Sequence, residues 1–294
     1  MDIQKYEVLI KAAELGSIKK AAAELGYTQA GLSYILKTLE DEMGLHLFHR
    51  DYGKLILTAA GREILPIAHH ICNEQRRLCS KVSELKNLES GRITVGVFTS
   101  IAIHWLPFLM EAFPKAYPGI RIDVKWYEEK EELDEMLEAG DVDCGFSVLP
   151  DVGENFDKIF LAKDPMMIIL AEDHPYASLP YFPSKAMEEI PYISGGEYSE
   201  MAELHYANGV KPVPAMVLKN DFAVMSMVSK GLGYGIFPAL MMEEPPFPLA
   251  VKEPEVIFAR EVGIVLRSLA EAPEAVAAFI SFTKAWVNGG NKKG

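Results

Sequence analysis

The chain has 294 residues, which is long enough for more than one domain with a substantial core. Of these residues 49% are apolar, yet no apolar run approaches the ~20 residues that a membrane-spanning helix requires. The formal net charge is −13, but residues 1–90 hold 12 Lys and Arg against 12 Asp and Glu, so the remaining residues carry the entire excess. A local basic surface for nucleic acid is therefore available in the N-terminal part, where Lys19, Lys20 and Lys37 outnumber Glu24.

The sequence carries no signature of export, catalysis or metal binding. Residues 1–5 lack the charged and apolar regions of a signal peptide, so we expect a cytoplasmic protein with no membrane partner. The cysteines Cys72, Cys79 and Cys144 form neither a disulfide framework nor a metal-ligand cluster, and we expect them to be reduced. No phosphate loop or zinc motif is present, and no recognisable motif ties a histidine to Cys144, so we expect neither an enzyme nor a cofactor.

The stretch from Ser17 to Leu36 has the pattern of a helix-turn-helix. Ala22 lets the second helix approach closely, Gly26 can adopt the positive φ of a tight turn, and Leu32 with Ile35 covers the inner face. The second helix would then expose polar side chains, which are those of Thr28, Gln29, Ser33, Tyr34 and Lys37. In isolation this pattern also fits an ordinary two-helix corner, so the flanking residues decide between the two interpretations.

The flanks favour the DNA-binding version of the motif. An apolar helical stripe precedes it and would supply a third packing helix; it comprises Tyr6, Val8, Leu9, Ala12 and Ala13. Apolar residues after the motif bracket the polar run 49–54 and predict a two-stranded wing; they are Leu45, Leu47, Phe48, Leu55 and Leu57. The wing tip carries the cations Arg50 and Lys54 and the turn residue Gly53.

A long helix is expected after the wing. Thr58 can cap it, and we expect it to run to about Ser90, with Gly91 ending it. Apolar residues repeat along it at seven-residue intervals, and further ones widen the stripe; they are Ile64, Ile71, Leu78 and Leu85, then Ile67, Ala68, Val82 and Leu88. Such a helix would be ~45 Å long, too long to pack within a small winged domain. We expect its seam to meet the same helix of a second subunit, and the alternative is that it packs on its own chain.

From Arg92 onwards, strand patterns alternate with helix patterns. Strands are expected at 93–97, 120–126, 142–148, 166–171, 192–194, 235–238 and 262–266, and helices at 106–117, 131–139, 221–230 and 273–287. The short connections and the alternation indicate parallel sheets covered by helices. Two sheet-based lobes crossed by two strands would give a hinge with a cleft between them.

The order of residues in the first sixty-odd positions closely resembles the N-terminal domain of LysR-type transcriptional regulators. The matching positions are Ala13, Gly16–Ser17, Ala21–Ala22, Leu25, Thr28–Gln29, Leu32–Ser33, Ile35, Leu39–Glu40, Gly44, Leu47–Phe48, Arg50, Leu57–Thr58 and Gly61. The rest of the chain is more loosely similar to the effector domain of this family, which looks like a periplasmic binding protein. The segments that carry this second likeness are Leu106–Pro107, 140–143, His174–Pro175 and 231–238.

The resemblance implies an α/β fold with a head rich in α-helix. Residues 1–58 would form a winged helix-turn-helix DNA-binding domain, 59–90 a linker and dimerisation helix, and 91–294 a two-lobed, type II periplasmic-binding-protein-like effector domain. Lobe I would comprise about 91–163 and 268–288, and lobe II about 164–267. The family also implies a homodimer joined through the linker helix and a homotetramer assembled as a dimer of dimers.

Similarity to the family places Gln29 at the start of the recognition helix, where its amide can bond an adenine in the major groove. Ser33 and Lys37 suit phosphates, and Arg50 suits a phosphate or the minor groove beside the wing. Thr28 serves equally well as a helix cap, and Lys37 could simply be solvated. The full set of expected DNA-binding residues is Ser17, Thr28, Gln29, Ala30, Ser33, Tyr34, Lys37, Arg50 and Lys54.

Three of the residues in the recognition helix qualify this comparison. Ala30 stands where the family usually has proline, and Tyr34 stands where it usually has a basic residue. A tyrosine can still reach a phosphate or pack on a thymine methyl group, but it loses a cation. Gly31 lies inside the helix and costs about 1 kcal/mol relative to alanine. We therefore expect the fold to hold and the base preference to differ.

The effector site is expected in the cleft, where strand ends and helix N-termini meet. The loop containing Thr99 and Ser100 is the leading candidate, because two hydroxyls and nearby backbone amides can hold a carboxylate or another polar ligand. The further candidates are Ser147, Ser194 and Gly195 at similar strand ends, and Phe222 as an apolar wall. None of them is an arginine, so an anionic ligand would depend on helix ends and hydroxyls. Each could also be an ordinary turn or packing residue.

Together these features indicate a transcriptional regulator that binds a double-stranded DNA operator and responds to a small-molecule co-inducer in the cleft of its C-terminal domain. The alternative is a cytoplasmic small-molecule sensing or binding module, in which the N-terminal segment only dimerises. Sequence-selective, salt-dependent DNA binding distinguishes the two hypotheses.

Overall fold

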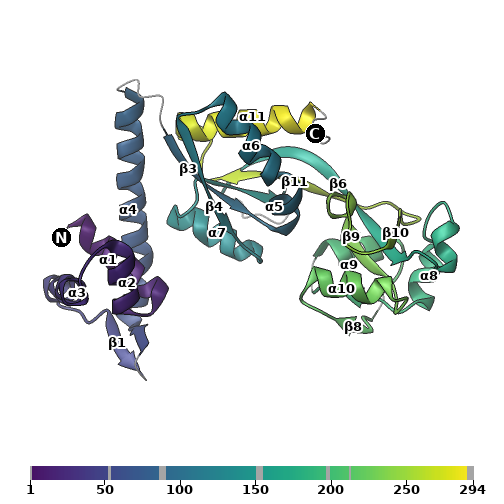
Figure 1. The fold of residues 1–294 in the computed structure, drawn as a ribbon, viewed down its shortest axis with the longest axis horizontal. Coiled ribbons are helices and arrows are strands. Elements are labelled where there is room, and N and C mark those ends of the chain that lie inside the picture. The colour runs from purple at the N-terminus through teal and green to yellow at the C-terminus, as the bar shows by residue number, and fades with distance from the viewer. Residues whose placement is uncertain are drawn as a thin grey trace.

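The computed structural model describes residues 2–51, 54–85, 91–149, 155–196, 199–211 and 213–289. Figure 1 shows a small helical head at one end of a long helix, α4 (Ala59–Leu85), and a two-lobed α/β part beside the other half of that helix. The N-terminus lies in the head, and the C-terminal helix covers the lobe nearest to α4. The three parts therefore follow one another along the molecule in sequence order.

The head is a winged helix-turn-helix. Its elements are α1 (Ile3–Leu15), α2 (Ile18–Leu25), α3 (Gln29–Met43), β1 (Phe48–Asp51) and β2 (Lys54–Leu57). Side chains cap the two helices of the motif: Ser17 Oγ accepts from the Lys20 amide at 3.4 Å, and Thr28 Oγ1 accepts from the Gly31 amide at 3.0 Å. Gly26 ends α2 with φ of +73°, a conformation that glycine adopts without a Cβ penalty.

The apolar pattern of the head matches its core. The buried side chains from α1, α2 and α3 are those of Tyr6, Val8, Leu9, Ala12, Ala21, Ala22, Leu32, Leu36 and Leu39, with Leu47 from the loop before the wing. Ile35 is partly buried at the edge of this cluster. The predicted helix-turn-helix, its preceding helix and the wing are thus confirmed. Tyr52 and Gly53, at the predicted wing tip, lie outside the described residues.

Helix α4 begins where it was predicted, since Thr58 Oγ1 accepts from the Gly61 amide at 3.0 Å. Its predicted end needs correction. Gly91 does not cap the helix but is the first residue of strand β3, and residues 86–90 lie outside the described part of the chain. Pro66 lies inside the helix, where it has no amide to donate to the preceding turn.

Lobe I lies beside α4 and contains both chain ends of the two-lobed part. Its elements are β3 (Gly91–Val97), α5 (Thr99–His104), α6 (Leu106–Ala116), β4 (Ile120–Trp126), α7 (Lys130–Ala139), β5 (Cys144–Val148) and α11 (Glu274–Asn288). Its core lies between the sheet and the helices α5, α6 and α11; Trp105, Phe113, Phe146, Phe279 and Trp286 form edge-to-face contacts there.

Lobe II is connected to lobe I through the strands β6 (Asp157–Ala171) and β11 (Ala259–Leu266). Its own elements are η2 (Pro175–Ser178), α8 (Ser184–Glu189), β7 (Ile193–Ser194), α9 (Ser199–Ala207), β8 (Met216–Val217), α10 (Asp221–Ser229), β9 (Gly235–Pro238), η3 (Ala239–Met242) and β10 (Leu249–Lys252). The first half of β6 pairs with β11, and the second half pairs with β9 and β10. The strand β6 therefore runs from one lobe into the other.

The expectation of parallel sheets is only partly right. Within the described residues, a seven-stranded sheet has the order β10-β6-β11-β5-β3-β4, with β9 also paired to β6. The pairs β3/β4 and β3/β5 are parallel, as predicted, but β11 and β6 run antiparallel to their neighbours. The reason is that β6 leaves lobe I and β11 returns to it, so the two crossing strands have opposite directions.

Candidate nucleic-acid interface and effector site

Helix α3 presents its first residues outside the core of the head. Gln29 and Ala30 are exposed, and Tyr34, one turn later, is 73% exposed. The apolar side chains of the same helix, Leu32 and Leu36, are buried against α1 and α2, which fixes which face remains open. A face with an amide and a phenol at the N-terminal end of α3 is suited to contacts with base edges in a major groove.

The other expected DNA-binding residues differ in how the structure uses them. Lys37 and Lys54 are exposed, and Ser33 is half-buried. Ser17 and Thr28 both act as helix caps, and Thr28 is exposed as well, so its capping role does not exclude a DNA contact. Arg50 lies in β1 opposite Leu55, and its side chain lies outside the described part.

A buried ion pair lies where the two lobes join. Arg260 on β11 is opposite Asp164 on β6, and its Nε and Nη2 donate to Asp164 Oδ2 at 3.0 and 2.9 Å. Both side chains are only 8% exposed. The second carboxylate oxygen of Asp164 accepts from the Leu240 amide at 2.9 Å, so the charge of Asp164 is compensated from two sides.

The same arginine contacts both lobes. Its Nη2 donates to Ser100 Oγ in lobe I at 2.8 Å, and its guanidinium carbon lies 5.5 Å from the centre of the Phe98 ring. Its Nη1 lies 3.8 Å from Glu200 Oε1 on α9 of lobe II. Burial raises the pKa of Asp221 on α10, and the Arg260 charge partly opposes that rise. We call Phe98, Ser100, Asp164, Glu200 and Arg260 the hinge network.

Of the hinge network, the sequence predicted Ser100 as a site residue but did not predict Arg260, which makes the central contacts. Ser100 was predicted in a loop, but Thr99 and Ser100 are the first residues of helix α5, and Ser100 is buried. None of the expected effector residues is an arginine, yet the structure places Arg260 within hydrogen-bond distance of Ser100, so a guanidinium lies beside this candidate as well as hydroxyls and helix ends. A usable signal was present: charges of opposite sign occupy neighbouring positions on both crossing strands, Lys163–Asp164 and Arg260–Glu261.

The remaining expected effector residues are not members of the hinge network. Ser147 is buried inside β5, next to Phe146, whose carbonyl accepts from the Tyr127 hydroxyl at 2.5 Å. Burial raises the pKa of Tyr127. Ser194 Oγ donates to the Gly196 carbonyl at 2.7 Å, with Gly195 buried beside it. Phe222 is 53% exposed and packs edge-on to Phe247 at 6.5 Å. Within the described residues, no hydrogen bond or ring contact ties Ser194 or Phe222 to Arg260.

The described residues contain no cluster of three or more His, Cys, Asp or Glu side chains placed to hold a metal ion. Cys144 is fully buried in β5, and burial raises the pKa of its thiol, which keeps it protonated and unreactive. No helix in the described part of the chain has the length and apolar character to cross a membrane.

Both halves of the chain match known sequence families. Residues 3–62 match the family described as bacterial regulatory helix-turn-helix protein, lysR family, and residues 86–288 match the LysR substrate binding domain. The uncharacterized HTH-type transcriptional regulator YvbU of Bacillus subtilis (strain 168) is 30% identical over 289 residues, which cover 97% of this chain and 98% of that protein. The probable regulator LrrA of Synechococcus elongatus is 26% identical, with 95% of each chain covered.

Solved structures share the fold over nearly the whole chain. Full-length OxyR from Pseudomonas aeruginosa, in a cysteine-to-aspartate variant, gives a TM-score of 0.75 at 20% identity, with 97% of this chain and 95% of that chain covered. Full-length CbnR in complex with its target DNA gives a TM-score of 0.72 at 21% identity, with 97% and 99% covered. The arrangement of head, long helix and two lobes is therefore one that full-length regulators adopt.

Proposed function

The chain belongs to the LysR family of transcriptional regulators, and from that premise we propose how its parts share the work of a DNA-binding regulator with an effector-binding domain. The observation that carries the proposal is that the two family matches together cover both ends of the chain, the head and the two lobes. This coverage favours the regulator over the alternative of a sensing module without DNA binding. Because its target is DNA, we expect it to act in the cytoplasm, and we expect no catalysis.

Helix α3 is proposed as the recognition helix, in which Gln29 bonds an adenine. The exposed cations Lys37 and Lys54 are proposed to contact DNA phosphates and so position the protein on the duplex. Tyr34 stands at an exposed position where the family usually has a cation. We therefore expect an aromatic contact with a base at this position in place of an ionic contact with a phosphate. We expect a base preference that differs from those of its relatives and includes thymine beside Tyr34.

The test is footprinting and gel-shift on the DNA that flanks the protein's own coding region, at several salt concentrations. Gln29→Ala should weaken selectivity for the site by ~1–3 kcal/mol and leave nonspecific binding unchanged. Gln4→Ala, which removes an exposed amide from α1, is the matched control and should bind as the wild type does. Binding that is neither sequence-selective nor salt-dependent would refute the proposed DNA-reading role.

Helix α4 is proposed to join two subunits. At 1.5 Å per residue its 27 residues span about 40 Å, and one face carries the exposed apolar side chains Ile67, Ile71, Leu78 and Val82. A second copy of the same helix would cover this face, and family resemblance extends the dimer to a homotetramer. In sedimentation velocity, Leu78→Glu should shift the protein toward a smaller assembly. An unchanged sedimentation coefficient would mean that α4 does not form the interface.

The hinge network is proposed as the place where an effector is sensed. A small molecule bound between the lobes beside Thr99 and Ser100 would change the distances that Arg260 spans, and so the relative orientation of the lobes. Ser100→Ala should weaken the effector response while DNA binding stays intact. A thermal-shift screen of metabolites on the full chain identifies the ligand, because binding to the folded state raises the melting temperature.

A further inference from the structure

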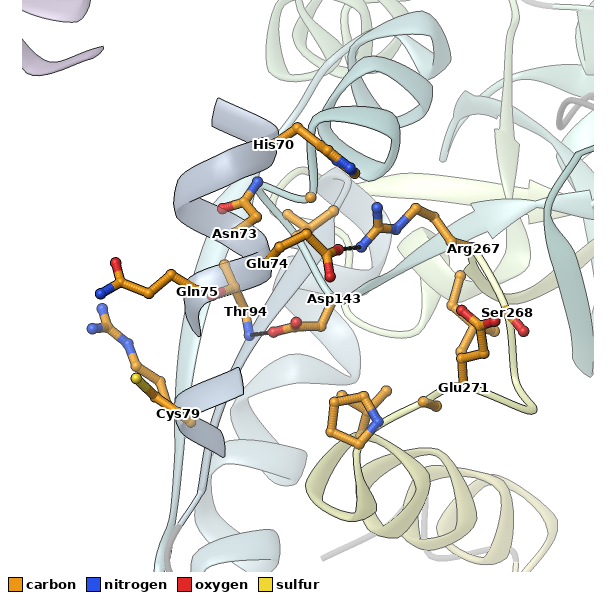
Figure 2. A pocket seen from close by; sticks show the side chains of 17 residues that line it. His70, Asn73, Glu74, Gln75, Cys79, Thr94, Asp143, Arg267, Ser268 and Glu271 are labelled. Atoms are coloured by element: carbon orange, nitrogen blue, oxygen red, sulfur yellow. Dashed lines mark hydrogen bonds and ion pairs between the residues drawn. The ribbon is translucent and has the colours of Figure 1, made fainter. Parts of the chain in front are cut away.

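A cavity lies outside the hinge network, between the linker helix α4 and lobe I. It has a volume of about 680 Å³, within the range of pockets that hold small molecules. Side chains of α4 form one wall, and the segment between β11 and α11 forms the opposite wall. In Figure 2, Glu74 of α4 and Arg267 of lobe I point toward each other across this space, while Ser268 and Glu271 lie on the far side from Asp143.

Polar contacts fasten α4 to lobe I next to this cavity. His69 Nδ1 lies 3.0 Å from Asp141 Oδ1, and Lys125 Nζ lies 3.4 Å from the other oxygen of that carboxylate. One turn further along α4, Asn73 Nδ2 donates to the carbonyl of Ala139. These residues attach α4 to the end of α7, so the position of the helix depends on contacts that border the cavity.

The contact that crosses the cavity is of a different kind. Arg267 Nη2 lies 3.6 Å from Glu74 Oε1, and the two side chains are 33% and 44% exposed. A partly exposed pair at that distance contributes little to stability, so a ligand can replace it at small cost. Arginine binds carboxylates bidentately, and a glutamate accepts from an ammonium group.

The lining therefore offers two arginines and several carboxylates around an apolar floor. Arg92 pairs with Asp123 on β4, which leaves Arg267 as the cation that faces α4 across the cavity. Glu74, Asp143 and Glu271 provide the carboxylates. Val142, Leu266, Ala272, Pro273 and Val276 supply the apolar surface. A carboxylate, an ammonium group and an apolar side chain on one small molecule match these three features together.

We propose that this cavity binds a zwitterion of the amino-acid class and that its binding alters the attachment of α4 to lobe I. The ligand carboxylate takes the place of Glu74 on Arg267, and its ammonium group takes the place of Arg267 beside the carboxylates. Since α4 carries the winged domain, replacing the Glu74–Arg267 contact with ligand contacts changes the position of the DNA-binding head. This effect does not pass through the hinge network. The site is thus distinct from the effector site proposed between the lobes.

The test uses the full chain without DNA, so it is independent of whether the proposed DNA contacts are right. Each standard L-amino acid is added separately, and the melting temperature is followed by tryptophan fluorescence. At least one amino acid should raise the melting temperature in a concentration-dependent way. Arg267→Gln should weaken its apparent affinity about tenfold or more, and Ala272→Phe, which fills the cavity, should abolish the shift.

The control variant is Lys115→Gln, which breaks an exposed ion pair on α6 of the same lobe and should keep the full shift. The proposal is overturned if no amino acid raises the melting temperature, or if the shift survives in both cavity variants. It is equally overturned if Ser100→Ala removes the shift while the cavity variants retain it, because binding would then occur between the lobes. If Ala272→Phe changes only the sedimentation coefficient, a second copy fills the cavity and the proposal fails.

Discussion

The winged head and the two-lobed part use their polar side chains in opposite ways. In the head, Ser17, Thr28 and Thr58 each accept from an amide three residues later in the chain. In the two-lobed part, Arg260 bonds Asp164 and Ser100, which precede it by 96 and 160 positions, and it does so inside the protein. Local caps leave the outer face of the head available for a partner, whereas the long-range bonds hold two lobes together.

The local caps of the head and the long-range contacts of the hinge network should therefore respond differently to substitution. A cap depends on one turn of helix, so its loss frays that turn and leaves the rest of the head in place. The hinge network depends on where both lobes lie, so its loss or rearrangement affects the whole two-lobed part. The hinge network is therefore the region in which a small ligand can have a large effect.

The largest effect is expected for Asp164→Ala. It leaves the Arg260 guanidinium buried without its main counter-charge and leaves the Leu240 amide without its acceptor. Breaking a buried pair in this way costs about 3–5 kcal/mol of the free energy of unfolding. Urea unfolding followed by tryptophan fluorescence measures the loss, since Trp105, Trp126 and Trp286 all lie in lobe I.

Glu111→Ala is the matched control, because it removes a carboxylate from an exposed pair with Lys115 in lobe I. It should leave the unfolding midpoint where it is in the wild type. Equal effects of the two substitutions would contradict the view that burial, and not pairing alone, makes the hinge network important.

The second largest effect is a loss of lobe II stability at acidic pH. His205 in lobe II is buried, with Nε2 2.9 Å from the Tyr234 hydroxyl, and burial lowers the pKa of His205 from 6.5 to about 4. The folded lobe therefore holds the neutral imidazole, while the unfolded chain binds a proton below pH 6.5. The stability contribution is fully present above pH 6.5 and is lost as pH falls from 6.5 toward 4, by up to about 3 kcal/mol.

Unfolding free energies of the wild type and His205→Gln, measured from pH 7 to pH 4, test this expectation. The wild type should lose more stability over that interval than the variant. His104→Gln in lobe I is the control and should follow the wild-type profile. Coincident profiles for wild type and His205→Gln would show that another group governs the acid response.

Sequence-based prediction also succeeds to different extents in the winged head and in the two-lobed part. The helices, turn and wing of the head were predicted, because the caps, the Gly26 turn and the apolar stripe each involve residues within a few positions of one another. Seven strands and four helices of the two lobes were also predicted, since their periodicity is local, but α5, α8, α9, β8 and β10 were not. The antiparallel direction of β6 and β11 was not, because it depends on how the chain leaves and re-enters lobe I.

The hinge network itself required the structure. Ser100, Asp164 and Arg260 are separated by 64 and 96 positions, and no local pattern joins them. Ser100 was proposed for its hydroxyl at a strand end, which is a weak criterion that Ser147 and Ser194 met equally well. Only the strand register, which places Arg260 opposite Asp164, shows which of the three hydroxyls an arginine reaches.

A smaller effect is expected at the junction between the two regions. Asn73→Ala removes the hydrogen bond from α4 to the Ala139 carbonyl, next to Gly140, whose φ is +69°. Loss of the donor should cost about 1–2 kcal/mol. Hydrogen exchange should become faster in the last turn of α7 and stay unchanged in the wing. Gln75→Ala, an exposed amide on the same helix, is the control, and similar exchange in both variants would mean that Asn73 does not fasten the junction.

The smallest effect is expected inside the head, at Gly31. Alanine there should gain about 1 kcal/mol of helix propensity. Its Cβ, however, would lie 3.1 Å from Thr28 Oγ1, the atom that caps the Gly31 amide, and weakening that cap costs about as much. Gly31→Ala alone should therefore change the free energy of unfolding by less than about 0.5 kcal/mol. In a Thr28→Ala background no cap remains to be disturbed, so the same substitution should stabilise the head by nearly the full amount. Equal effects in both backgrounds would show that position 31 does not act through the cap.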